Sequence, residues 1–330
     1  RSCFIDMNFS LKRYTAADID VWNAAVDNIV RQKSFLLNRN YMEYHSDRFT
    51  DASLMVLEPQ GKVLALFPAN VCRKDSRCVE SHGGLTYGGL LMSPHLTAKL
   101  TGEVFEAIIA YYREQGFNAL IYKPMPYIYC EYPCQEDLYW LFRNKATLLS
   151  RQISSVIDLA QPYSLSTLRK RKVKKSEKLA CLRMEMGAQH LKAYWQILDG
   201  VLQLRHDTLP VHTFEEMQLL MQRFPRNIQL AVCIDHVHNE VLAGCLLYIT
   251  PQVVHAQYIA SNDRGCEVGA LDLLFRNVIA ATPILYKGVR YFDFGTCNEQ
   301  GGWYLNEGLI FQKEGFGGRA VCYDSYLINY

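Results

Sequence analysis

Residues 229–246, QLAVCIDHVHNEVLAGCL, consist of two apolar runs that are separated by a short polar turn. Apolar runs of about four to eight residues that are bounded by turn residues are typical of buried β-strands. The sequence therefore predicts two adjacent antiparallel strands in this region.

A second copy of this pattern, SLMVLEPQGKVLAL, lies in the first half of the chain at residues 53–66. Each copy is followed by a glycine-containing extended stretch, a helical pattern, and an apolar strand that starts after Gly116 or Gly288. Val63 and Val241 are 178 residues apart, and the two glycines are 172 residues apart. The same order at nearly the same spacing indicates a duplicated domain, with a seam at which a ligand can bind.

Composition agrees with a folded protein of two domains. The chain has 330 residues, of which 49% are hydrophobic and 21% are charged, so each half is long enough to bury a core of its own. No apolar run approaches the roughly 20 residues that a membrane span needs, and we expect no span.

The eleven cysteines are scattered, and Cys130 and Cys134 form the one close pair. We interpret them as structural, expect no metal site, and predict a reducing, cytoplasmic location.

The order of the predicted elements favours an α/β fold with mixed α+β sheets that are largely antiparallel and flanked by helices. We place two domains at 1–160 and 161–330, because Gln161 and Pro162 interrupt the pattern.

Periodicity predicts helices at 15–32, 41–49, 97–115, 135–143, 164–180, 188–205, 213–223 and 267–281. It predicts strands at 53–58, 63–71, 79–92, 118–123, 146–158, 228–235, 240–249, 253–260 and 289–294, and a closing hairpin at 308–327.

Three short stretches near the C-terminus carry a resemblance to a known family. They are FDFG at 292–295, YLNEGL at 304–309 and KEGFGG at 313–318. With the doubled element order, they resemble the GNAT-superfamily proteins of the FemA/FemB peptidyltransferase type, which consist of two tandem GNAT domains. Within that group the chain is most similar to the acetyltransferase-like proteins of the Bacteroides type.

This resemblance implies an acyltransferase that moves an acyl or aminoacyl group onto an amine of a cell-envelope precursor. The donor implied is acetyl-CoA or another acyl-CoA, or else an aminoacyl-tRNA, with no bound cofactor. The partners implied are a nucleotide-linked or phosphate-containing envelope precursor and, for the second donor, tRNA. GNAT proteins bind acetyl-CoA through a loop of the form Q/R-x-x-G-x-G/A, whereas residues 264–270 read RGCEVGA. The spacing differs, so the sequence leaves both donors open.

Positive charge is concentrated in one predicted helix. Residues 169–178 carry a net charge of +6, although the whole chain carries only +2. At 100° per residue, Arg169 and Lys172 fall among the apolar residues of this helix, where a charge is costly unless it is paired or faces a wet cleft. Both are therefore candidates to bind a phosphate group. The alternative is a solvated basic helix whose side-chain stems pass the edge of the core.

Lys313 and Asp293 are the candidate catalytic residues. Lys313 matches the lysine of the Fem-type F-K-x-G-F-G motif, and a fixed ammonium there could stabilise an oxyanion. The alternative is a surface lysine in a hairpin. Asp293 lies between two phenylalanines that strand alternation places on the opposite face, so it could accept a proton from the attacking amine or orient that amine. Equally, Asp293 could cap the turn at Gly295.

Four further residues are weaker candidates to line a ligand site. Gly269 and Ala270 open a predicted helix, whose first amides could bind phosphate. Close packing of a helix on a strand is the alternative explanation of two such small residues, and it is the one that we favour. Tyr304 and Glu307 belong to the C-terminal motif and are implied by the resemblance alone.

His82 and His255 occupy matching places in the two copies, and we interpret both as buried histidines with satisfied hydrogen bonds.

Two other functions remain open. One is an acetyl-CoA-dependent N-acetyltransferase of an amino sugar or small amine. The other is a module without catalysis that keeps the fold and binds a phosphate-containing ligand or RNA.

Overall fold

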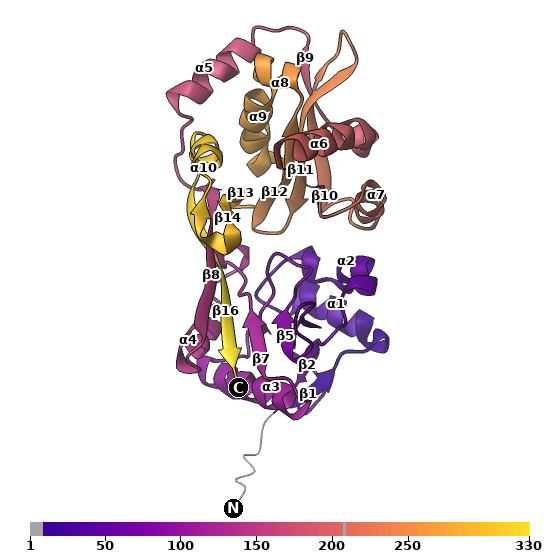
Figure 1. Cartoon of the computed structure of the whole chain (residues 1–330), viewed down its shortest axis with the longest axis vertical. Coiled ribbons are helices and arrows are strands. Elements are labelled where there is room, and N and C mark those ends of the chain that lie inside the picture. Colours follow the sequence, from indigo (N-terminus) through magenta and orange to yellow (C-terminus); the bar gives the residue numbers. More distant parts are fainter. Residues whose placement is uncertain (1–8, 207–208) are drawn as a thin grey trace, which may run out of the picture. The chain divides into compact units, whose positions relative to one another are not determined.

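The structure is a computed structural model that describes residues 9–206 and 209–330. These residues form two compact units (Figure 1). The first contains the described chain up to Gln152, together with 301–303 and 322–330, and the second contains 153–300 and 304–321. The division at 152/153 differs from the expected boundary at 160/161. It falls within strand β8 (Thr147–Asp158), and the end of the last strand, β16 (Arg319–Asn329), returns to pair with β7 (Ala119–Tyr122).

The first unit has two groups of hydrogen-bonded strands. One has the order β1-β2-β3-β6, and the other has the order β4-β5-β7-β16, in which β5 and β7 run parallel. The further bounds are β1 Ser10–Arg13, β2 Leu54–Leu57, β3 Val63–Phe67, β4 Asn70–Val71, β5 Cys78–Ser81 and β6 Leu91–Met92. Its helices are α1 Ile19–Asn28, α2 Arg39–Met42, α3 Ala98–Glu114 and α4 Glu136–Arg143. Short 3-10 turns lie at Ala16–Asp18, Phe35–Leu37, Glu43–Arg48 and Tyr127–Tyr129.

Helix α3 supplies an apolar face to the core of this unit. Val104, Phe105 and Ile108 are buried against Leu54 and Leu64 of the strands. Thr97 accepts a hydrogen bond from the N–H of Leu100 at the start of the helix. At its end the chain turns through Gly116, whose φ of 89° suits a residue without a Cβ. The predicted helix at 97–115 is confirmed within one residue at each end.

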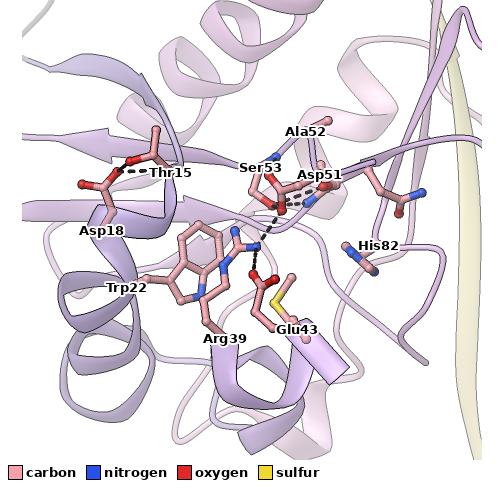
Figure 2. A network of polar contacts seen from close by, with 12 residues as sticks. Thr15, Asp18, Trp22, Arg39, Glu43, Asp51, Ala52, Ser53 and His82 are labelled. Atoms are coloured by element: carbon pink, nitrogen blue, oxygen red, sulfur yellow. Dashed lines mark hydrogen bonds and ion pairs between the residues drawn. The ribbon is translucent and has the colours of Figure 1, made fainter. Parts of the chain in front are cut away.

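A buried cation joins the N-terminal helices to the strands of the first unit. Arg39 is 1% exposed, and its guanidinium lies 3.4 Å from the ring centroid of Tyr14 and 4.0 Å from that of Trp22. The same group pairs with Asp51 at 2.6 Å and Glu43 at 3.6 Å (Figure 2). The cation is therefore compensated by two aromatic faces and two carboxylates.

The second unit has one sheet of order β8-β13-β12-β11-β10-β9. Its further strands are β9 Leu182–Met186, β10 Ile228–Asp235, β11 Glu240–Ile249, β12 Val253–Ser261 and β13 Tyr291–Thr296, with a small pair β14 Asn298–Glu299 and β15 Tyr304–Leu305. Its helices are α5 Thr167–Ser176, α6 Leu191–His206, α7 Phe214–Arg223, α8 Asp263–Val268, α9 Ala270–Leu285 and α10 Glu307–Glu314. Further 3-10 turns lie at Ala188–His190 and Gln300–Gly302. The expected strands at 228–235 and 240–249 agree with β10 and β11 at every residue.

Helices cover both faces of this sheet. Ala243 and Cys245 of β11 pack into the core that α9 completes with Leu274 and Phe275. Gly244 points to the other face, where an added Cβ would lie 2.4 Å from the ring of Tyr194 in α6. Because side chains alternate along a strand, α6 and α9 lie on opposite faces. This arrangement is the mixed, helix-flanked sheet that the sequence predicts.

Several expectations about local structure were wrong. The strand expected at 79–92 is two short strands, β5 and β6, with a loop between them, and two further segments differ for a clear reason. Residues 308–327 are not a hairpin, because Asn306 caps helix α10 by accepting a hydrogen bond from the N–H of Leu309 at 3.0 Å. Residues 264–270 are not an open loop, because Asn262 caps the short helix α8 in the same way and Gly269, with φ of 72°, ends it. Both segments contain a side-chain cap that periodicity does not reveal.

Candidate functional site

The candidate site lies where two parallel strands of the second unit part. β12 pairs with β13 from Val253↔Tyr291 to His255↔Asp293, and no further pair joins them among the residues that the structure describes. β12 continues to Ser261 beside β11, while β13 continues to Thr296 beside β8. Strands that separate leave backbone groups and side chains open to a ligand at their carboxyl ends. His255 and Asp293 are the last paired residues, so they stand at this opening.

Asp293 is fully buried and accepts several hydrogen bonds. Its Oδ1 accepts from the hydroxyl of Ser154 and, at 2.8 Å, from the N–H of Gly295. Its Oδ2 lies 3.0 Å from Nδ1 of His255. The structural role that the sequence offered, a cap on the turn at Gly295, is therefore present. Phe292 and Phe294 pack around Phe275 on the opposite face, as strand alternation predicts.

His255 connects this carboxylate to the surface. Its side chain is 14% exposed, and the hydrogen bond to Asp293 assigns the proton to Nδ1, which leaves Nε2 as the basic nitrogen. Gly295 keeps the edge of the ring uncovered, since an added Cβ there would lie 3.4 Å from Cε1 of His255 and 3.9 Å from Nε2. Sequence reasoning interpreted His255 as a satisfied histidine and did not connect it with Asp293. The one feature of the sequence that could have drawn attention to His255 was its place in the repeat, which matches that of His82.

Lys313 lies in the last turn of α10 and is 6% exposed, so its expected alternative as a surface lysine in a hairpin was wrong. Its Nζ donates hydrogen bonds to the carbonyl oxygens of Gly295 and Thr296, both at 3.0 Å. Burial lowers the pKa of Lys313 below its ordinary value of 10.5, although Cys297 and Asp293 oppose this shift. A buried ammonium thus lies at the end of β13, next to the strand opening.

The two basic candidates of α5 differ in burial, because Arg169 is buried and Lys172 is exposed. Arg169 is buried, pairs with Asp272 of α9 at 2.7 Å, and lies 5.2 Å from the ring centroid of Phe316. Its inward position is as predicted, and Asp272 compensates its charge. Lys172 is exposed, so its expected inward position was wrong. The buried face of α5 is narrower than the sequence predicted, because it consists of Arg169, Val173 and Ser176 and does not extend to Lys172.

The start of α9 is covered by α5. The hydroxyl of Ser176 donates to the carbonyl oxygens of Val268 and Gly269, at 2.6 Å and 3.0 Å. An added Cβ on Gly269 would lie 2.7 Å from Oγ of Ser176, and Ala270 is fully buried. Close packing accounts for both small residues, which was the alternative to phosphate binding.

The remaining candidates lie on the surface of the second unit. Tyr304 on β15 is 51% exposed, and Glu307, the first residue of α10, is exposed as well. Among the hydrogen bonds and ion pairs described, none joins either residue to His255, Asp293 or Lys313. The three central residues therefore form the candidate site without them.

The described part of the chain contains neither a cluster of metal ligands nor a helix that could span a membrane. No group of three or more His, Cys, Asp or Glu residues is arranged to hold a metal ion in the ranges 9–206 and 209–330. Over the same ranges, the helices are all too short or too polar to cross a bilayer.

Comparison with known proteins agrees with this architecture. Residues 167–302 match the family model of the acetyltransferase (GNAT) domain. The whole chain is similar in structure to FemX, with 10% identity, coverage of 97% of both chains and a TM-score of 0.67. No protein with curated function matches it in sequence.

Two other solved structures extend this likeness. A conserved protein of unknown function from Bacteroides thetaiotaomicron has 9% identity, covers 97% of this chain and 98% of its own, and gives a TM-score of 0.61. The C-terminal domain of a putative lysylphosphatidylglycerol synthetase from Agrobacterium fabrum has 14% identity, covers 95% and 92%, and gives a TM-score of 0.58. At these identities the likeness concerns the fold.

These findings define the class of the protein. It has the tandem-GNAT, FemAB-like fold that the C-terminal motif implied, and residues 167–302 form a GNAT domain. By class it is an acyltransferase.

Proposed function

We propose that the protein transfers an acyl group from an acyl-CoA thioester to the amine of a phosphate-containing cell-envelope precursor. The observation that carries this proposal is the buried centre of His255, Asp293 and Lys313 at the strand opening of the GNAT unit. GNAT folds use acyl-CoA donors. One structure of similar fold is named as a domain of a putative lysylphosphatidylglycerol synthetase, a name that supports a phosphate-containing acceptor.

The geometry suggests a direct transfer. The amine nitrogen attacks the carbonyl carbon of the thioester while Nε2 of His255 removes one of its protons. Asp293 acts as a positioning residue, because it holds Nδ1–H and stabilises the imidazolium that forms. The carbon–sulfur bond of the tetrahedral intermediate then breaks, and the leaving thiolate takes the proton from His255. The products are an amide and free CoA, without a covalent enzyme intermediate.

Lys313 has an electrostatic part in this scheme. Two of its three ammonium protons are donated to the carbonyl oxygens of Gly295 and Thr296, so direct hydrogen bonding to an oxyanion is not its main role. A positive charge in a largely buried position still stabilises the negative charge that develops on the carbonyl oxygen. We propose that role for it.

One observation favours a second donor, an aminoacyl-tRNA. In the described chain, helix α8 occupies the place where the expected CoA loop would lie, and α5 covers the start of α9. A donor whose phosphates bind elsewhere would suit this arrangement. We keep this donor as the alternative within the same chemistry.

The test is a transfer assay with radiolabelled acyl donors. The purified chain is incubated with labelled acetyl-CoA or with labelled aminoacyl-tRNA, and with a UDP-linked muropeptide, an amino sugar or a small amine as acceptor. Label in the acceptor, together with release of CoA thiol, supports the main proposal, and label from tRNA alone supports the second donor. Binding of either donor in a thermal-shift assay without any turnover would instead favour a module without catalysis.

A further inference from the structure

Helix α5 and the turn after it expose a dense group of cations. Within the described chain, none of these side chains forms an ion pair with an acidic residue. The one acid of the segment, Glu177, pairs with Arg276 of α9, and Lys175 donates to the backbone carbonyl of Glu267 at 3.1 Å. The exposed cations are Lys170, Arg171, Lys172, Lys174, Lys175 and Lys178.

The fold fixes this cationic surface in place. Arg169, Val173 and Ser176 face inward, where Arg169 pairs with Asp272 and Ser176 binds the carbonyls at the end of α8. Apart from the hydrogen bond of Lys175 to Glu267, the contacts described for the helix come from residues other than the exposed cations. The exposed side chains other than Lys175 can be changed without removing the contacts that hold the helix.

The cationic surface also contains apolar groups. Leu168 is 42% exposed, and at helical spacing it lies on the same face as Arg171, Lys172 and Lys175. Tyr163, just before the helix, is 37% exposed. An apolar side chain surrounded by cations suits the boundary between lipid headgroups and acyl chains.

The chemistry favours a lipid surface over a nucleic acid. Five of the six cations are lysines, which act as point charges, whereas recognition of individual phosphates favours the planar fork of arginine. Residues 165–180 contain no aromatic side chain, so Tyr163 before the helix is the one ring named at this surface, whereas binding of single strands uses aromatic rings for successive bases. Clusters of four to eight lysines or arginines on a helix are typical of binding to anionic lipids.

We infer that α5 docks the protein on a membrane surface that is rich in anionic phospholipid, with the lysines over the headgroups and Leu168 at the acyl boundary. This surface goes beyond the proposed chemistry, because it concerns where the enzyme works and involves none of the three residues of the candidate site.

The experiment is co-sedimentation of the full chain with vesicles of phosphatidylcholine, with or without about 30% phosphatidylglycerol, at low and high salt. We expect binding that requires phosphatidylglycerol and weakens as salt rises. The triple variant Lys170→Glu, Lys174→Glu, Lys178→Glu should bind at least tenfold more weakly. The control variant Lys62→Glu, Lys74→Glu, Lys287→Glu makes the same change of charge at exposed lysines elsewhere and should bind within about twofold of the wild type.

Thermal melts establish that both variants fold, and the soluble transfer assay reads the chemistry separately. Absence of binding to phosphatidylglycerol vesicles, or equal binding by the triple variant, would refute the inference. Tighter binding of tRNA than of vesicles at physiological salt, lost in the same triple variant, would also overturn it and assign α5 to nucleic acid. In each case the acyl-transfer result stands on its own.

Discussion

Each unit contains a pair of parallel strands that ends beside a histidine, but the surroundings of the two histidines differ. In the second unit, His255 on β12 is held by Asp293 on β13 at 3.0 Å. In the first unit, β5 and β7 pair up to Ser81↔Tyr122, and the next residues are His82 and Lys123. His82 accepts a hydrogen bond from the N–H of Gly84 at 3.1 Å, and burial lowers its pKa well below the ordinary range.

The difference shows what makes a histidine suitable for proton transfer. Asp293 fixes Nδ1 of His255 at 3.0 Å and leaves Nε2 toward the opening, and we propose that this nitrogen takes up and returns the proton of the amine. The charged groups that act on His82 are His45, Lys123 and Arg39, which all disfavour its protonation. Burial also lowers the pKa of Lys123 to about 8. The same strand ends therefore carry a histidine held by a carboxylate in one unit, and in the other a histidine and a lysine whose pKa values are both lowered by burial.

The strongest test of this comparison is His255→Gln. We expect the rate of acyl transfer to fall by about a thousandfold, because general base catalysis contributes on the order of 10²–10⁴. The matched control is His190→Gln, since His190 also pairs with a carboxylate, Glu185, at 2.9 Å, with a side chain 17% exposed. Initial rates at saturating donor measure the effect. Wild-type rates in His255→Gln would remove His255 from the mechanism.

The first unit also has a buried carboxyl group, that of Asp137, but its partner is a tyrosine and not a histidine. Asp137 accepts a hydrogen bond from the hydroxyl of Tyr122 at 2.8 Å, and burial raises its pKa from 3.8 to about 6. The folded state therefore prefers the neutral form, and stability falls as the pH rises from 3.8 through about 6. Between pH 3.8 and pH values well above 6, the free energy of unfolding of Asp137→Asn should therefore rise by about 3 kcal/mol relative to that of the wild type, since one pKa unit corresponds to about 1.4 kcal/mol.

Denaturant unfolding of the wild type and of Asp137→Asn, from pH 3 to pH 8, measures this difference. The two curves should agree below pH 3.8 apart from a constant offset, and should separate above it. A separation that does not change with pH would mean that Asp137 titrates in the folded state as it does in the unfolded chain.

Lys313→Met tests the buried cation of the second unit. We expect the transfer rate to fall by about tenfold, because the charge acts at some distance from the oxyanion. The control Lys33→Met removes another buried lysine that binds a backbone carbonyl, that of Asp27 at 2.9 Å, and should leave the rate unchanged. A rate loss in the control equal to that in Lys313→Met would indicate a structural effect only.

The stability of the same variant gives an independent check with a defined sign. Because burial lowers the pKa of Lys313, the unfolded chain binds more protons than the folded one between the folded pKa and 10.5. The wild type should therefore gain stability relative to Lys313→Met as the pH rises through that interval. Chemical unfolding at several alkaline pH values follows this gain.

The smallest expected effect is that of Lys123→Met in the first unit. If the proton-transfer pair belongs to the second unit, the transfer rate should change by less than about twofold, because no proton is exchanged at this lysine. Loss of its hydrogen bond to the carbonyl of Leu85, 2.7 Å long, should lower the melting temperature only slightly. A rate loss of tenfold or more would show that the first unit takes part in the chemistry.

The sequence alone determined the class of fold and the order of most elements, although β1, β9 and α10 were not predicted. The strands at 228–235 and 240–249 were predicted at the residues where the structure has them, and the helix predicted at 213–223 begins one residue later, at Phe214. These features depend on neighbours within a few residues, so they can be read along the chain. The C-terminal motif likewise led to the GNAT class.

Only the tertiary structure decided which polar residues meet. Asp293 and His255 are 38 residues apart in sequence, and they meet because β12 and β13 lie side by side in parallel. Asp272 is 103 residues from Arg169, and the ion pair between them directs Arg169 inward while Lys172 faces solvent. Periodicity gives the face of an element but not its partner, because partners depend on how distant elements pack.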